Sequence, residues 1–381
     1  MTAFTVTKRA QRVAVACFFF VVGLSFASWA SRIPDIKARL GLNEALLGGV
    51  LFALPVGSML SMPLSGWLVA RFGSKRIVTI ATICYPLMLI VIGLTASVWQ
   101  LVAALFGFGL LGNMCNISIN TQAVGVESQY GRSIMASFHG LWSLAGFCGA
   151  AIGKLMVAAD LSPFYHFCIV CAVSIVLVIS VRGSAVEKDA AHPDQPIFAK
   201  PDNHLLKLGL IAFSCMACEG TMFDWSGVYF QEVVQAPKAQ ITLGYACFMG
   251  TMATGRFLGD RIVTAFGRQR VLQLSGIVIT TGLLTAVLFP TLVMAALGFL
   301  LVGFGVSSVV PLVYSSAGKS KKFSPGVALA AVSTIGFLGF LIGPPVIGFI
   351  AHALSLRWSF TLIAVLGFGT TVLASLMRWE D

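Results

Sequence analysis

Charged side chains are scarce in this sequence. Asp, Glu, Lys and Arg make up 10% of the 381 residues, whereas a soluble globular domain carries roughly 25%. Apolar residues account for 57%. This shortage of charge excludes an ordinary soluble domain, and soluble enzyme chemistry with it, and it indicates an integral membrane protein. We therefore expect no catalytic residues.

Acidic residues are the scarcer charged class, with 14 Asp and Glu against 25 Lys and Arg, so the formal net charge is +11. A positive charge of this size is one mark of nucleic-acid binding. Here, however, the basic residues lie in short segments between apolar stretches, and no basic face carries interleaved aromatic side chains. The pattern predicts a membrane protein with no nucleic-acid partner.

Metal-ligating and nucleotide-binding patterns are also lacking. Nine cysteines are present, and the two CxxC pairs lie inside apolar stretches without histidine partners, so we interpret them as packing residues. The segment 318–320 (Gly-Lys-Ser) is similar to the end of a phosphate loop, but Val313 stands at its first glycine and no strand precedes it. We expect no metal, no cofactor and no ATP-driven pump.

Long apolar stretches dominate the chain. A helix needs about 20 apolar residues to cross a bilayer, and the sequence contains twelve such stretches. They are 12–31, 45–70, 77–96, 99–126, 133–158, 163–182, 205–231, 241–264, 271–289, 291–317, 325–353 and 357–379. We predict an all-α integral membrane protein, with an N-terminal six-helix bundle (1–182), a polar, proline-containing cytoplasmic linker (183–204) and a C-terminal six-helix bundle (205–381).

The basic residues predict the orientation of the chain. If both termini are cytoplasmic, 18 Lys and Arg fall in cytoplasmic segments and six in outside segments, which is the bias expected of cytoplasmic loops. Lys8, Arg9 and Arg12 precede the first apolar stretch, which has no convincing cleavage site and is therefore interpreted as the first span. We expect a multi-pass protein of the plasma membrane.

The two halves of the chain repeat each other. Three pairs of segments match in the same order at nearly the same offset. They are 71–78 with 265–272, 107–112 with 298–303, and 146–153 with 336–343, at offsets of 194, 191 and 190. Because each half has six spans, both begin with the same orientation, which predicts parallel repeats about an axis along the membrane normal.

The loop after the second stretch carries a motif. Residues 66–76 (GWLVARFGSKR) resemble the pattern G-x-L-x-D-R-x-G-x-[RK]-[RK] of the major facilitator superfamily, with Ala70 at the usual Asp position. The six-plus-six arrangement extends the resemblance over the whole chain, and 119–149 and 219–225 are similar to the superfamily's bacterial YbjJ-like branch. The resemblance implies a secondary transporter of the bacterial inner membrane, with a central cavity lined by spans 1, 4, 7 and 10.

Three amides follow one face of the fourth span: Asn113, Asn116 and Asn120. Lipid cannot satisfy amide groups, so this face must meet protein or water. By the resemblance, the three amides point into the cavity, where their donors and acceptors suit a neutral polar solute. The alternative is hydrogen bonding between helices. Gln122 lies off that face and is a weaker candidate for substrate binding.

Two acids lie well inside the seventh span, where an unpaired charge is costly: Glu219 and Asp224. Each is a candidate proton carrier, and the alternative for each is a structural hydrogen bond. Their separation of five residues puts them on different helix faces, so we do not expect them to share a proton. His139 in the fifth span is a third candidate, as a proton relay.

Four further side chains are candidate substrate contacts. Ser28 and Trp29 share a face of the first span, where Trp29 either stacks on a substrate ring or anchors the membrane interface. Trp142 lies in the fifth span. Tyr314 lies in the tenth, which Pro311 is expected to kink.

Charged residues near the cytoplasmic ends of spans are candidates for a gate. Arg256 and Asp260, four residues apart in the eighth span, are positioned to form an ion pair. Arg71 in the motif loop and Glu127 at the end of the fourth span are the other candidates. In the superfamily a structural salt bridge and a gate overlap, because its gates are salt bridges that open.

These features predict a proton-coupled secondary transporter that works by alternating access. The amides and the few intramembrane charges favour a small, polar, uncharged solute, such as a sugar or a related metabolite. The expected partners are this solute, protons and membrane lipid, and the expected state is a monomer. Two alternatives stay open: a drug or metabolite exporter of the same fold, favoured by abundant Phe and Met, and a sensor that binds without transport.

Overall fold

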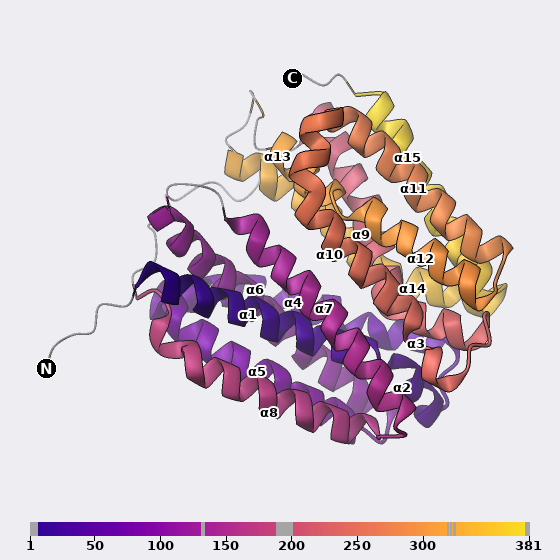
Figure 1. Ribbon diagram of the computed structural model, residues 1–381, viewed down its shortest axis with the longest axis horizontal. Coiled ribbons are helices and arrows are strands. Elements are labelled where there is room, and N and C mark those ends of the chain that lie inside the picture. The colour runs from indigo at the N-terminus through magenta and orange to yellow at the C-terminus, as the bar shows by residue number, and fades with distance from the viewer. Residues whose placement is uncertain are drawn as a thin grey trace, which may run out of the picture. The chain divides into compact units, whose positions relative to one another are not determined.

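The computed structural model describes residues 7–130, 134–187, 201–317, 320, 322 and 325–377, apart from the side chains of 136, 260, 325–327 and 330. The described residues form helices joined by short turns, with no strand among them (Figure 1). This agrees with the predicted all-α class, because in lipid a helix satisfies all its backbone hydrogen bonds internally.

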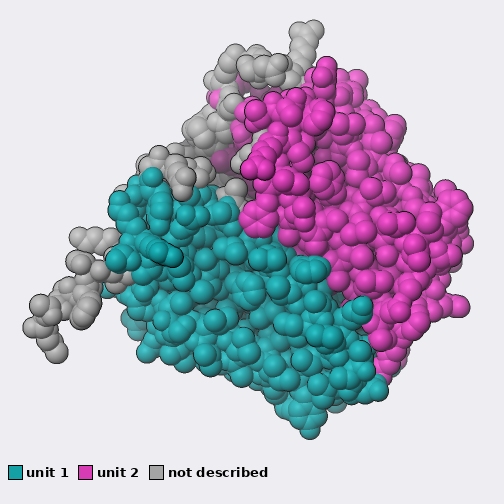
Figure 2. Space-filling view, in the orientation of Figure 1, with its two compact units in different colours: residues 1–40, 53–192 teal, residues 41–52, 193–381 magenta. Residues whose placement is uncertain are grey.

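The chain folds into two compact units, coloured separately in Figure 2. The first comprises Met1–Leu40 and Ala53–His192, and the second Gly41–Phe52 and Pro193–Asp381. Helices of the first unit are α1 (Lys8–Ala30), α2 (Ile33–Leu40), α4 (Ala53–Phe72), α5 (Ser74–Leu94), α6 (Val98–Tyr130), α7 (Met135–Ala158), α8 (Pro163–Val181) and η1 (Arg182–Ser184). Helices of the second are α3 (Glu44–Leu51), α9 (Asn203–Glu232), η2 (Lys238–Gln240), α10 (Leu243–Phe266), α11 (Arg268–Leu288), α12 (Leu292–Val306), α13 (Val309–Ala317), α14 (Pro325–Ala353) and α15 (Leu356–Ser375).

The helices coincide with the predicted spans. In the described part of the chain, 11 helical stretches are long and apolar enough to cross a membrane. The remaining predicted span, 241–264, is the helix α10. It is 24 residues long, which corresponds to about 36 Å at the rise of an α-helix. Its charged residues, among them Arg256 and Arg261, lower its hydropathy below that of the others.

One short segment from the first half of the sequence belongs to the second unit. Residues 41–52 lie inside the predicted N-terminal bundle, yet α3 packs on α14 of the second unit. Glycines allow this contact: a Cβ atom on Gly48 would lie 2.7 Å from the Pro344 carbonyl oxygen, and one on Gly348 would lie 2.5 Å from that of Glu44. The division between the units otherwise falls inside the predicted linker, of which 188–200 lie outside the described residues.

Helix packing within each unit confirms the repeat. In the first unit α1 packs on α7, α4 on α6, and α5 on both α6 and α8. In the second unit the corresponding helices make the corresponding pairs: α9 with α14, α10 with α12, and α11 with α12 and α15. The two halves of the sequence therefore encode the same arrangement of spans.

The turns after the second and eighth spans match in backbone detail. Gly73 (φ +82°) separates α4 from α5, and Gly267 (φ +76°) separates α10 from α11. The Gly73 N–H donates to the Val69 carbonyl at 2.9 Å, and the Gly267 N–H donates to the Val263 carbonyl at 2.8 Å. Both glycines adopt a left-handed conformation that disfavours other residues. The offset of 194 predicted for this loop is confirmed.

The offset of 191 predicted for the fourth and tenth spans is wrong by one helical turn. A Cβ atom on Gly109 would overlap the Leu54 carbonyl oxygen, and one on Gly303 would overlap the Phe248 carbonyl oxygen. In these equivalent contacts, the two glycines are 194 residues apart, and so are Leu54 and Phe248. The sequence match at 191 joins glycines on the same helix face, since a three-residue shift is nearly one turn.

The tenth span is interrupted, as Pro311 predicts. Helix α12 ends at Val306 and α13 begins at Val309, so the break falls at Ser307 and Ser308. A proline ring clashes with the carbonyl group four residues earlier, which here is that of Ser307. The interruption leaves backbone groups near the middle of this span free for other partners.

Candidate functional site

A pair of opposite charges lies inside the second unit. Arg256 Nη2 of α10 is 3.6 Å from Glu219 Oε1 of α9, and the two side chains are 16% and 7% exposed. Glu219 lies about 24 Å along its helix, near the middle, given the rise of an α-helix. A buried carboxylate needs a compensating charge or hydrogen bond, and Arg256 supplies the charge.

Two further side chains lie near Glu219, one on the same helix and one on α13. Cys215 Sγ, one turn earlier on α9, lies 3.8 Å from Glu219 Oε1 and 3.7 Å from the Val306 carbonyl oxygen. That carbonyl is the last of α12, at the break in the tenth span. The hydroxyl of Tyr314 on α13 is close enough to Glu219 to interact with it electrostatically. The site therefore joins α9, α10 and both halves of the broken span.

Sequence reasoning did not find this pairing. It placed Arg256 with Asp260, whose side chain lies outside the described ones, so that prediction stays open. Glu219 and Arg256 are on different helices, and no local spacing relates them. The available signal was that each is a charge deep within an apolar stretch, and such charges usually pair with one another.

Asp224 lies apart from this pair, as its five-residue separation predicts. Its side chain is half-buried, and it makes no hydrogen bond or ion pair with another described residue. The Tyr245 hydroxyl on α10 lies within electrostatic range of Asp224. Phe223 beside it contacts Tyr245, Phe248 and Phe340, with ring centroids 5.6 to 6.4 Å apart. Asp224 is thus an acid next to an aromatic cluster.

The three amides of the fourth span do not act as one set. Asn113 is buried, and its Nδ2 donates to Ser65 Oγ of α4 at 3.4 Å, which is a contact between helices. Asn120 Nδ2 donates to Asn116 Oδ1 at 2.9 Å and to the Asn116 carbonyl at 2.8 Å. Asn116 is exposed and Asn120 half-buried. The last two remain accessible, whereas Asn113 is used in packing.

Both ends of the Gln122 side-chain amide form hydrogen bonds inside the first unit. Its Nε2 donates to Ser74 Oγ at 2.6 Å and to the Val186 carbonyl at 2.9 Å, and its Oε1 accepts from the Val186 N–H at 2.7 Å. Both ends of the amide therefore fasten α6 to the start of α5 and to the segment after η1. We leave Gln122 out of the proposed solute contacts for this reason.

Glu127 contacts the beginning of the next helix. Its Oε2 accepts from the N–H groups of Ile134 and Met135 at 2.7 and 2.8 Å. These are among the first N–H groups of α7, which have no partner within the helix. Arg71, the other gating candidate of this unit, lies exposed at the end of α4.

The candidates on spans 1 and 5 divide into buried and accessible groups. Ser28 is fully buried, and its hydroxyl donates to the Leu24 carbonyl at 2.8 Å. Trp29 is 1% exposed, and its Nε1 has no hydrogen-bond partner among the described residues. Trp142 is half-buried against Phe26, at 6.1 Å between ring centroids. His139 is exposed and meets the Phe19 ring edge-on at 5.2 Å.

Two repeated bundles of membrane-length helices, with charged and amide groups held between the helices, form the architecture of a multi-pass membrane transporter. The family model of the Major Facilitator Superfamily matches residues 15–324. The chain belongs to this family.

Known proteins that are similar to this chain in sequence or fold are consistent with this family assignment. An uncharacterized MFS-type transporter of Yersinia pestis is 36% identical over 358 residues, which are 93% of each chain. The membrane protein MosC of Rhizobium meliloti is 30% identical, over 94% of this chain and 88% of the relative. Among solved structures, a bacterial homologue of the human lysosomal transporter Spinster, inward-facing and unoccupied, has a TM-score of 0.75 at 15% identity, with 97% of each chain covered. At that identity the likeness concerns the fold alone.

Proposed function

We propose that this transporter is proton-coupled and moves a small, polar, uncharged solute by alternating access. It acts as a monomer in the bacterial cytoplasmic membrane, with both termini cytoplasmic. The observation that carries the proposal is the buried pair of Glu219 and Arg256.

The pair links proton binding to the stability of one conformation. Ionised Glu219 attracts Arg256 in a site with little water, where the interaction is stronger than at a surface. A proton on Glu219 removes that attraction. A conformation that contains the pair is thus favoured by the ionised acid, and one that separates the two groups is favoured by the protonated acid. Asp224 and His139 are the secondary candidates for this role.

The accessible amides of the first unit support a neutral solute. In the described structure Asn116 Nδ2 and Asn120 Oδ1 carry no hydrogen bond. They present one donor and one acceptor, which matches a hydroxyl group that both accepts and donates. Trp142 and Tyr314 are further proposed solute contacts. Gates at Arg71, Glu127, Arg256 and Asp260 are part of the same proposal.

The test uses proteoliposomes that contain a pH-sensitive dye, after a thermal-shift screen against sugars, nucleosides, peptides and antibiotics has found a stabilising solute. Glu219→Gln should abolish solute-driven proton influx and uphill accumulation while keeping the thermal shift and solute exchange. Asp224→Asn, an acid-to-amide change on the same helix at a secondary candidate, is the comparison variant and should keep most of the influx, because Glu219 is the proposed carrier. Normal accumulation by Glu219→Gln would show that the coupling assignment is wrong.

An exporter of drugs or metabolites is the second candidate. The observation that favours it is the aromatic cluster of Phe223, Tyr245, Phe248 and Phe340 beside Asp224, a combination that suits organic cations. A strain that lacks the protein would then become sensitive to such compounds, and Asp224→Asn would fail to restore resistance. A sensor, the third candidate, would bind solute without flux in the liposome assay.

A further inference from the structure

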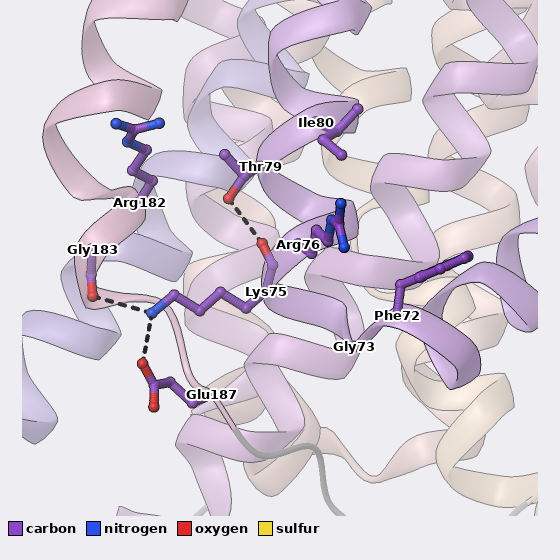
Figure 3. A pocket seen from close by; sticks show the side chains of 9 residues that line it. All are labelled: Phe72, Gly73, Lys75, Arg76, Thr79, Ile80, Arg182, Gly183 and Glu187. Atoms are coloured by element: carbon purple, nitrogen blue, oxygen red, sulfur yellow. Dashed lines mark hydrogen bonds and ion pairs between the residues drawn. The ribbon is translucent and has the colours of Figure 1, made fainter.

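An open basic groove lies at one end of the first unit, lined by side chains to which the proposed transport mechanism assigns no role. Its volume is about 700 Å³. It lies between the α4–α5 turn and the segment that follows α8, and Figure 3 shows the side chains around it. The lining residues are Phe72, Gly73, Lys75, Arg76, Thr79, Ile80, Arg182, Gly183 and Glu187.

Buried hydrogen bonds hold the two walls of the groove together. Gln122, fully buried beneath them, bonds to Ser74 on the α5 side and to Val186 on the α8 side. Each wall is thus fixed by a residue adjacent to a lining side chain, Lys75 on one side and Glu187 on the other. The groove is a built feature of this unit.

Positive charge dominates the groove. Three cations line it against one anion, Glu187. Lys75 Nζ lies 3.1 Å from Glu187 Oε1 and 3.5 Å from the Gly183 carbonyl oxygen, so its charge is partly neutralised (Figure 3). Arg76 and Arg182 are both exposed, and no ion pair with a described residue occupies either. Among the described residues, no carboxylate therefore competes with an external anion for these two guanidinium groups.

The rim of the groove is apolar. The Phe72 and Ile80 side chains are 46% and 48% exposed, and the Arg76 guanidinium lies over the Phe72 ring at 5.9 Å from its centroid. A soluble anion would gain nothing from this surface. An amphiphile with an anionic headgroup and hydrocarbon chains would satisfy both the cations and the exposed apolar side chains.

We propose that this groove binds the headgroup of an anionic phospholipid, with the acyl chains against Phe72 and Ile80. Arg76 and Arg182 contact the phosphate, since guanidinium groups match phosphate oxygens in bidentate geometry. Glu187 limits the affinity because it competes for Lys75. The inference is independent of proton coupling and rests on the proposed orientation only for the leaflet, which is the cytoplasmic one.

The test counts bound lipids by native mass spectrometry of the full-length protein in detergent, with phosphatidylglycerol or phosphatidylcholine added. The wild type should retain phosphatidylglycerol in preference to phosphatidylcholine. Arg76→Gln with Arg182→Gln should weaken phosphatidylglycerol binding by about tenfold or more, because each cation near a lipid surface contributes roughly fivefold. Arg261→Gln with Arg270→Gln, which removes two exposed cations from the second unit, is the charge-matched control and should change binding less than twofold.

Glu187→Gln tests the proposal in the opposite direction. It should strengthen phosphatidylglycerol binding several-fold, because it releases Lys75, and a gain of affinity cannot result from misfolding. Equal losses in the two Arg pairs would overturn the proposal and show only the general attraction of basic loops. Displacement of the lipid by inorganic phosphate or glycerol phosphate at equal concentration would also overturn it, since the ligand would then be a soluble anion.

Discussion

The two units carry different groups at equivalent positions of the same helix packing. A Cβ atom on Gly149 would lie 2.7 Å from Ala27, and one on Gly339 would lie 2.7 Å from Ala217, so the first and seventh spans are related by an offset of 190. This offset puts Trp29 at the position of Glu219, and the offset of 194 puts Met62 at that of Arg256. The first unit thus has a buried indole and an exposed thioether where the second has an ion pair. The buried polar residues of the fourth span, Asn113, Ser118 and Gln122, are neutral.

This difference separates what the fold requires from what the function requires. The first unit shows that the packing of spans 1, 2 and 4 needs no charge at these positions. A buried ion pair is weak evidence for stability, because desolvation offsets much of its attraction. The pair in the second unit is therefore the feature on which the proposed proton coupling depends.

Removal of one partner of the ion pair should cause the largest loss of stability. Arg256→Met copies the first unit and leaves Glu219 buried without a counter-charge, so we expect a loss on the order of 3 kcal/mol in the free energy of unfolding. Glu219→Gln with Arg256→Met should recover at least half of it. Denaturant unfolding of the protein in detergent measures both. A double variant no more stable than Arg256→Met would show that the pair itself is structural.

Alanine substitutions at glycines that make equivalent contacts within each unit should reduce the stability of the protein equally. Gly109→Ala and Gly303→Ala each push a Cβ atom into a carbonyl oxygen of the neighbouring helix, so each should cost about 2 kcal/mol. Gly66→Ala is the matched control, since nothing lies within 4 Å of its Cβ position, and it should be nearly neutral. Thermal unfolding compares the three variants. A loss at one of the two glycines alone would contradict the equivalence of the units at this contact.

Polar groups within the first unit should separate into structural and functional ones. Gln122→Ala leaves the Val186 backbone groups without partners and should cost about 2 kcal/mol of stability, given the net value of several buried hydrogen bonds. Asn120→Ala removes an accessible amide and should change stability by less than about 0.5 kcal/mol, while it weakens binding of the solute found in the screen. Thermal shifts with and without that solute test both. Unaltered solute binding in Asn120→Ala would remove the amide pair from the proposed contacts.

Substitutions at the turn glycines should destabilise the protein less than those at the interhelical glycines, and by equal amounts. Gly73→Ala and Gly267→Ala each place a Cβ atom in a left-handed conformation, at a cost of about 1 kcal/mol. Nothing lies within 4 Å of either Cβ position, so conformational strain is the sole expected cause. Differential scanning fluorimetry is sensitive enough to compare them. A clear difference between the two variants would show that the loops diverge despite their shared backbone.

The sequence by itself determined the spans, the six-plus-six repeat and the turns at Gly73 and Gly267. Hydropathy and turn chemistry act over neighbouring residues, and lipid leaves a spanning segment little choice other than a helix. Even the break at Pro311 follows from a clash four residues away.

Which side chains meet depends on how the helices pack against one another. The pairing of Glu219 with Arg256, the attachment of Val186 by Gln122, and the docking of residues 41–52 on α14 each join segments far apart in the chain. Such contacts depend on how helices rotate and approach one another, and small residues such as Gly48 and Gly348 set that approach. No local pattern records the partner, because its identity is a property of the packing between helices.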